Sequence, residues 1–254
     1  MLVLIAGVTG NLGQNLVRSL LSRGHRVRGL GRNPSKLDND IQSSLESFVQ
    51  SQNHYDVPAL EKACEGVDAV ICSYLGTPEL QLEGQLLLLR AAERVEVLFS
   101  VPGHGDFGPE NHGVWDPLRK EMHVWGQGNE IWHWTTEGDC AEFTAAILDR
   151  EDAEDQQFWT VCSGESTLPE MAETYRKVRG IGGNVVKKGN LEDLRHEAFV
   201  ARARGSVKEF WKYIGWFYQL FTVDGSWVLE DLKNGRLGVQ TTSLEKFIED
   251  NDEI

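Results

Sequence analysis

The sequence predicts an α/β protein: a doubly wound parallel sheet in the N-terminal half, followed by a smaller C-terminal α/β lobe. An apolar run at Leu2 to Ala6 leads directly into a glycine-rich turn, as expected of a buried strand at the centre of such a sheet. Strand-like and helix-like segments then alternate through the first hundred residues. We therefore divide the chain into residues 1–100 and a lobe of residues 101–254 that completes one compact protein.

Composition limits the classes of function. The chain has 254 residues, 41% of them apolar and 25% charged, with a net charge of −14. Such an acidic surface argues against direct binding to nucleic acid or anionic membrane. No apolar run reaches the ~20 residues of a membrane span, and we expect no signal peptide. Four cysteines without a CxxC pair indicate reduced thiols, and hence a cytoplasmic location.

The glycine-rich turn, Gly7-Val-Thr-Gly10-Asn-Leu-Gly13, lies between the first strand and a helix whose leucine pattern ends at Gly24. In a dinucleotide-binding turn, Gly7 would permit the sharp bend and Gly10 would let the backbone approach a pyrophosphate. Gly13 would let the helix pack on the strand, with free N–H groups of its first turn facing the phosphates. The alternative is a glycine-rich turn without a ligand.

The segment after the second strand, residues 25–30, indicates which dinucleotide. Sites for NAD usually have an acidic residue here to hold the ribose 2′-hydroxyl. This chain instead has Arg32 and Lys36, which would bind a 2′-phosphate that a carboxylate would repel. The pattern favours NADP(H) over NAD(H), the alternative being two solvated surface cations.

The alternation continues with a strand at residues 47–50, a helix at 57–64 and a fourth strand within 66–73. The end of that fourth strand should open toward the cofactor, because ligands bind beyond the carboxyl ends of such strands. A leucine-rich helix at residues 80–94 is apolar on most sides, and we expect it to be well buried.

The N-terminal stretch LIAGVTGNLGQNLVRSLLSRGHRVRGLGRNPSKL resembles the NmrA-like and isoflavone-reductase-like proteins, which are atypical short-chain dehydrogenases. The overall pattern is similar to that of the fungal NmrA-like proteins. The segments GNEIWHWTTEGDCAEFTAAIL and STLPEMAETYRKVRG are also similar to that family. The resemblance implies a Rossmann-like fold that binds NADPH, with a substrate cleft formed by the C-terminal lobe. By motif position it implies a set of cofactor-binding residues, namely Gly7, Thr9, Gly10, Asn11, Leu12, Gly13, Arg32, Lys36, Ser73, Tyr74 and Gly76.

The same resemblance indicates a missing segment. In the family, a fifth strand, a loop with a catalytic lysine, a helix and a sixth strand follow the leucine-rich helix. Here Arg94 runs directly into the apolar stretch of residues 95–101. A strand and its crossover helix take ~30 residues, so more than a trimmed loop is absent near residues 94–96. The lysine has no counterpart between Lys62 and Lys120, and no tyrosine has a lysine four positions on. We assign no catalytic residue.

In the C-terminal lobe, His104 and Trp115 are the candidates for contact with a substrate. The spacing of histidines in the loop at 103–117 fits no metal site, and we predict no metal. A cleft that binds an aromatic ligand could be lined by four tryptophans, Trp115, Trp125, Trp132 and Trp134, although such residues more often pack in the core. An apolar stripe at residues 208–221 predicts a packed helix. Asn234-Gly235 predicts a hairpin turn, and we expect the acidic tail, residues 248–254, to be frayed.

Three functional hypotheses remain open. The first is a reductase that transfers hydride from NADPH to a small aromatic or phenolic substrate. The second is a non-catalytic protein that senses NADP(H) and acts through a protein partner, in which case a nuclear location is also possible. The third is an inactive form of either, lacking the catalytic segment.

Overall fold

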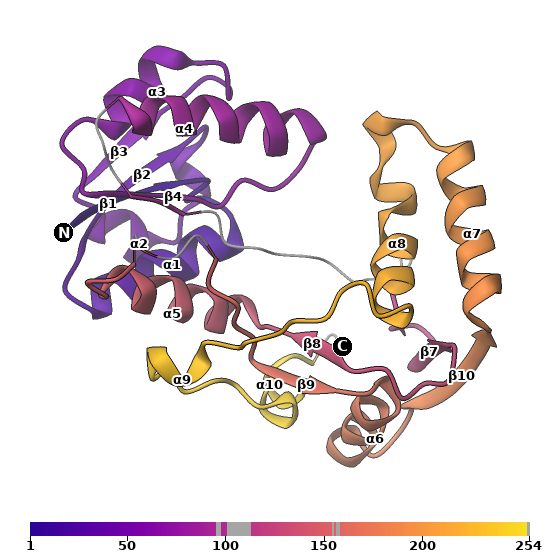
Figure 1. Ribbon diagram of the computed structural model, residues 1–254. Coiled ribbons are helices and arrows are strands. Elements are labelled where there is room, and N and C mark those ends of the chain that lie inside the picture. Colours follow the sequence, from indigo (N-terminus) through magenta and orange to yellow (C-terminus); the bar gives the residue numbers. More distant parts are fainter. Residues whose placement is uncertain (95–97, 101–112, 154, 156–157, 253–254) are drawn as a thin grey trace. The chain divides into compact units, whose positions relative to one another are not determined.

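The computed structural model describes residues 1–94, 98–100, 113–153, 155 and 158–252 (Figure 1). They form two compact units that are discontinuous in sequence. The first comprises Met1–His104, Glu137–Trp159 and Gly235–Val239, and the second comprises Gly105–Thr136, Thr160–Asn234 and Gln240–Ile254. The sequence suggested a division at residue 100, and in the structure two later segments return to the first unit.

The first unit is built on a five-stranded parallel sheet in the order β3-β2-β1-β4-β5. Its strands are β1 (Leu2–Ala6), β2 (Arg26–Gly31), β3 (Ser47–Gln50), β4 (Ala69–Cys72) and β5 (Leu98–Ser100). Its helices are α1 (Asn11–Ser22), η1 (Pro34–Lys36), α2 (Asn39–Ser44), α3 (Val57–Cys64), the π-helical turn η2 (Leu80–Gly84), α4 (Gln85–Glu93), α5 (Glu137–Leu148) and α9 (Asn234–Leu237).

Helices cover both faces of this sheet, as Figure 1 shows. Successive residues of a strand point to opposite faces. Leu2 and Leu4 of β1 accordingly pack in one apolar cluster with α3 and α4, whereas Val3 and Ile5 pack in another with α1, α2 and α5. All four side chains are at most 4% exposed. The predicted Rossmann-like, doubly wound α/β fold is therefore confirmed.

Strand β5 bears on the predicted missing segment. It follows α4 with only residues 94–97 between them, and it pairs in parallel with β4 at the edge of the sheet. The chain thus places this strand directly in the fifth position. The junction at 95–97 and the loop at 101–112 lie outside the described residues, and the absence of a catalytic segment stays a prediction.

The leucine-rich helix is less buried than its composition suggested. Leu88, Ala91 and Ala92 of α4 are at most 5% exposed and pack against the sheet. Leu82 of η2 and Leu86 of α4, on the other hand, are mostly exposed. A helix on the outside of a sheet buries only the stripe that faces the strands, so the expectation of burial on most sides was wrong.

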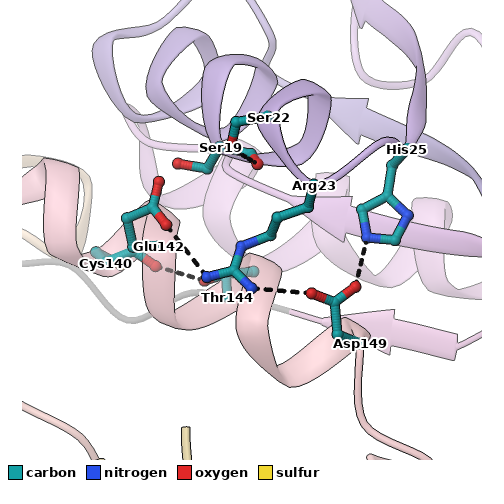
Figure 2. A network of polar contacts seen from close by, with 8 residues as sticks. All are labelled: Ser19, Ser22, Arg23, His25, Cys140, Glu142, Thr144 and Asp149. Carbon is teal, nitrogen blue, oxygen red and sulfur yellow. Dashed lines mark hydrogen bonds and ion pairs between the residues drawn. The ribbon is translucent and has the colours of Figure 1, made fainter. Parts of the chain in front are cut away.

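A polar network ties α5 to the end of α1 (Figure 2). The Arg23 guanidinium donates to Asp149 at 2.9 Å and to Glu142 at 3.3 Å. The other carboxylate oxygen of Asp149 lies 2.8 Å from Nε2 of His25, a residue only 9% exposed. These bonds and the apolar contacts of Ala141 explain why a helix 115 positions beyond α1 belongs to the first unit.

Replacing Arg23 with methionine should lower the free energy of unfolding by about 1–2 kcal/mol, because two half-exposed carboxylates lose their shared cation. Chemical denaturation followed by circular dichroism would measure the change. Arg18→Met is the matched control on the same helix: Arg18 pairs with Asp38 at an exposed site, where we expect at most about 0.5 kcal/mol. Equal losses in the two variants would contradict a structural role for the network.

The second unit contains a three-stranded sheet of order β10-β7-β6 and the antiparallel pair β8-β9. Its strands are β6 (Trp115–Asp116), β7 (Glu121–Trp125), β8 (Trp132–Trp134), β9 (Gly164–Ser166) and β10 (Asn184–Gly189). Its helices are α6 (Leu168–Arg179), α7 (Leu191–Arg204), η4 (Val207–Glu209), α8 (Trp211–Val223) and α10 (Leu244–Asp250). Leu194, Phe217 and Leu220 form a core between α7 and α8, which confirms the packed helix predicted near residues 208–221.

One sequence prediction near the C-terminal end was wrong. Asn234-Gly235 begins the short helix α9 and makes no hairpin: the Asn234 side chain donates to Cys162 O at 2.6 Å and accepts from Cys162 N at 3.3 Å. The first part of the acidic tail is helical through Asp250, and its last residues, 253–254, lie outside the described residues. Arg179 holds it by donating to the carbonyl oxygens of Ile248 and Asn251, both at 2.6 Å. In both places the contacts are with residues distant in sequence.

Candidate functional site

The turn between β1 and α1 is bent as the glycine pattern predicted. Gly7 has φ = +84°, and a β-carbon there would lie 2.8 Å from the carbonyl oxygen of Ser73. The amide of Gly7 donates to Leu30 O at 3.0 Å, and Gly10 N closes the turn by donating to Gly7 O at 3.0 Å. Positive φ and this close approach both require glycine. The turn is therefore fixed between the ends of β2 and β4.

The start of α1 is packed closely against this turn. A β-carbon at Gly13 would lie 2.4 Å from Gly7 O and 2.7 Å from the Cα of Val8, so only glycine lets the helix approach the strand so closely. Gly10 is the N-cap residue, and no side chain caps the helix. A β-carbon on Gly10 would meet only Gly7 O, at an ordinary 3.5 Å. The first turn of α1 thus offers N–H groups and a partial positive charge to an anion.

A cavity of about 570 Å³ opens at the carboxyl ends of the strands in the first unit. Residues from the ends of β1, β2, β3 and β4 line it, consistent with the rule that ligands bind beyond these ends in parallel sheets. Its predicted lining residues are Gly7, Thr9, Gly10, Arg32, Lys36, Ser73, Tyr74 and Gly76. The structure thus brings together eight of the eleven residues assigned to a cofactor.

The other three predicted residues lie at the start of α1 and do not line the cavity. Leu12 is 8% exposed and packs in the core beneath the turn, and Gly13 forms the close helix–strand contact. Asn11 is the first residue of α1 and is exposed. These positions shape the turn, and the backbone N–H groups there are the part that a phosphate could reach.

The cationic end of the cavity contains Arg32 and Lys36. Arg32 follows β2 directly, and Lys36 ends η1, where the Asn33 side chain accepts from Ser35 N at 3.0 Å. Among the described residues neither cation forms an ion pair, and no acidic side chain lines the cavity. Both charges are therefore available to an anionic group of a ligand.

Sequence reasoning missed the part of the cavity after β3. Ser51, Asn53 and His54 line it there, together with Thr77 and Leu80 beyond β4. Ser51 is 7% exposed, and Nε2 of His54 is buried without a hydrogen-bond partner in the described part of the chain. The rule that pointed to the ends of β2 and β4 applies equally to β3 and could have found these residues.

The predicted substrate contacts are not part of this cavity. His104 lies outside the described residues. Trp115 lies on β6 and lines a different cavity, formed within the second unit. Trp125 and Trp132 are each 7% exposed and belong to two separate apolar clusters, so core packing accounts for most of their surface. Tyr74 lines the cavity of the first unit and also packs in the apolar core, and burial raises its pKa well above the ordinary value.

Residues 7–125 match the sequence profile of a family described as NAD(P)H-binding. This part of the chain is an NAD(P)H-binding domain. A curated relative, the bifunctional pinoresinol-lariciresinol reductase of Sinopodophyllum hexandrum, is 33% identical over 123 residues. That match spans 46% of this chain and 38% of the length of the relative.

Solved structures resemble the fold over nearly the whole chain. An isoflavone reductase superposes with a TM-score of 0.68 at 15% identity, covering 98% of both chains. The NADPH-dependent quinone oxidoreductase of Escherichia coli, complexed with NADPH, gives 0.65 at 15% identity, covering 98% of this chain and 99% of that one. Together with the curated relative, these matches confirm that the chain resembles the isoflavone-reductase-like proteins, as the sequence predicted. That the chain is of the fungal type stays a prediction.

Within the described residues, every helix is too short or too polar to traverse a lipid bilayer.

Proposed function

We propose that the cavity of the first unit binds NADPH and that the protein is a reductase of small aromatic or phenolic molecules. The observation that carries the cofactor choice is the pair Arg32 and Lys36: within the described part of the chain neither forms an ion pair, and no acidic residue lines the cavity. A carboxylate at the end of β2 would favour the ribose hydroxyl of NADH, whereas two cations favour a 2′-phosphate.

Each part of the cavity has a distinct task in this proposal. The backbone N–H groups of the first turn of α1, which follows the bend from Gly7 to Gly10, would bind the pyrophosphate. Arg32 and Lys36 bind the 2′-phosphate, and the segment from Ser73 to Gly76 lies on the nicotinamide side. Bound NADPH supplies a hydride. The chain would contribute binding and orientation of the dinucleotide, and the C-terminal lobe, Trp115 included, would contribute contacts to a substrate.

A second candidate function is a non-catalytic sensor of NADP(H) that acts through a protein partner. The sequence favours it at one point: no lysine occurs between Lys62 and Lys120, and no Tyr-x-x-x-Lys pair is present. In ordinary short-chain dehydrogenases such a lysine lowers the pKa of the tyrosine that donates a proton. Binding and turnover must therefore be measured separately.

Titration calorimetry with NADPH and NADH, followed by an assay for NADPH consumption with aromatic carbonyls and enones, separates the candidates. The reductase predicts tight NADPH binding and turnover of at least one aromatic acceptor. Tight binding without turnover across the panel would favour the sensor. Failure to bind either dinucleotide would reject both and would favour an inactive form.

A further inference from the structure

The second unit contains a cavity of about 250 Å³ between its three-stranded sheet and α8. Its lining residues come from β6, β7, β10 and α8, with one more from the segment before β6: Gly113, Trp115, Asp116, His123, Trp125, Lys188, Trp216 and Gln219. All of them lie in one compact unit. We propose that this cavity binds a small single-ring aromatic carboxylate.

Polar residues occupy positions where a core is expected. Along β7, Met122 and Val124 point into one apolar cluster, and Trp125 points to the opposite face, into the cluster with α8. His123 shares that face by the alternation of the strand. Gln219 of α8 meets it from the other side and is only 3% exposed. A polar cavity inside a helix–sheet interface costs stability, which a ligand that uses these groups would offset.

The cation at the rim is positioned by a bulge. The pairing of β10 with β7 shifts register between Lys187 and Gly189, which leaves Lys188 as the extra residue. Bulges change the direction in which a side chain points. Lys188 lines the cavity, although the residue as a whole is exposed. Within the described residues, Lys188 forms no ion pair. Its charge is therefore free to meet an anion.

Two further polar groups beside the cavity are buried ring nitrogens. Nε1 of Trp115 and Nε2 of His123 are buried and have no hydrogen-bond partner in the part of the chain that the structure describes. The nearest ion-pair oxygen, on Glu121, is 3.8 Å from Nε2 of His123, beyond hydrogen-bond reach. Burial lowers the pKa of His123, and the charge of Lys188 lowers it further, so the imidazole is neutral near pH 7. Buried groups of this kind normally have partners, and two of them beside one cavity indicate a bound species.

The lining carboxylate is already engaged. Oδ1 of Asp116 accepts from the amides of Leu118 and Arg119, both at 3.0 Å. The Arg119 amide, followed by that of Leu118, lowers the pKa of Asp116 and keeps it ionised. Two backbone amides thus hold one oxygen of this carboxylate, and Lys188 is the cation that the lining offers to an anion.

The size and walls of the cavity define the rest of the ligand. Three indoles, of Trp115, Trp125 and Trp216, provide flat apolar walls that favour an aromatic ring. A volume of about 250 Å³ is below the ~300–1,000 Å³ of sites for drug-sized molecules, and so fits one ring. The ring would lie among the indoles and its carboxylate would meet Lys188, His123 and Gln219.

Titration calorimetry of the full chain with benzoate, in the absence of NADPH, tests this proposal. We expect a Kd of about 1 mM or tighter, in keeping with so small a ligand. Benzyl alcohol, which lacks the charge, should bind about tenfold more weakly. Because no cofactor is present, the result does not depend on whether the proposed reductase activity exists.

Lys188→Met and Lys187→Met form a matched pair, since both residues are exposed neighbours on β10 and only Lys188 lines the cavity. Lys188→Met should weaken benzoate binding about tenfold and remove the preference over benzyl alcohol, whereas Lys187→Met should change the Kd less than about twofold. Circular dichroism checks that both variants fold. Equal effects of the two variants, or no benzoate binding to the unchanged chain at tenfold the expected Kd, would overturn the proposal.

Discussion

Gly10→Val should abolish measurable binding of both NADPH and NADH, with a loss of more than about 100-fold in affinity. The side chain would fill the space over the N-terminus of α1, where the backbone N–H groups must approach the pyrophosphate. The fold itself should tolerate the change, because a β-carbon at Gly10 meets only Gly7 O at 3.5 Å. Titration calorimetry with each dinucleotide measures the effect.

This substitution separates binding from folding. We expect the free energy of unfolding of Gly10→Val to fall by only about 1 kcal/mol, the usual difference between N-cap residues. Gly13→Val is the contrasting variant: its β-carbon would lie 2.4 Å from Gly7 O, so this chain should lose stability as well as binding. Unchanged dinucleotide affinity in a folded Gly10→Val protein would remove the pyrophosphate role from this turn.

Arg32→Ala should weaken NADPH binding by about 10–100-fold and leave NADH binding within about twofold. The guanidinium can bind the 2′-phosphate with two parallel N–H bonds, and NADH has no group at that position. The ratio of the two dissociation constants, measured by titration calorimetry, reports the effect directly.

Arg26→Ala controls for the loss of a cation on the same strand. Arg26 begins β2, at the opposite end from Arg32, where it pairs with Glu46 at 2.8 Å and does not line the cavity. We expect both affinities to stay within about twofold in this variant. If Arg32→Ala lowered the NADPH and NADH affinities equally, the assignment of Arg32 to a 2′-phosphate would be wrong.

The sequence by itself determined the sheet and the turn of the first unit. β3 and α3 have the bounds that were read from the sequence, and Gly7 has the positive φ that the dinucleotide-type turn requires. These features follow from local physics. Buried parallel strands read as short apolar runs, and glycines occur where the backbone bends or approaches another segment closely.

The same local reasoning located two edges of the cavity in the first unit and missed a third. Arg32 and Ser73 were found because a motif or a strand end pointed to them. Ser51, Asn53 and His54 were missed because no distinctive residue type marks the end of β3, although the topology brings that end to the same opening.

Only the tertiary structure decided which segments belong together. α5 joins the first unit because Asp149 reaches Arg23 and His25, and a pairing across more than 120 positions leaves no signal in a local pattern. The cavity of the second unit likewise assembles Asp116, His123, Lys188 and Gln219 from four elements. Each of these residues looks like an ordinary surface position along its own strand or helix, and it becomes part of a site only when the sheet and α8 pack together.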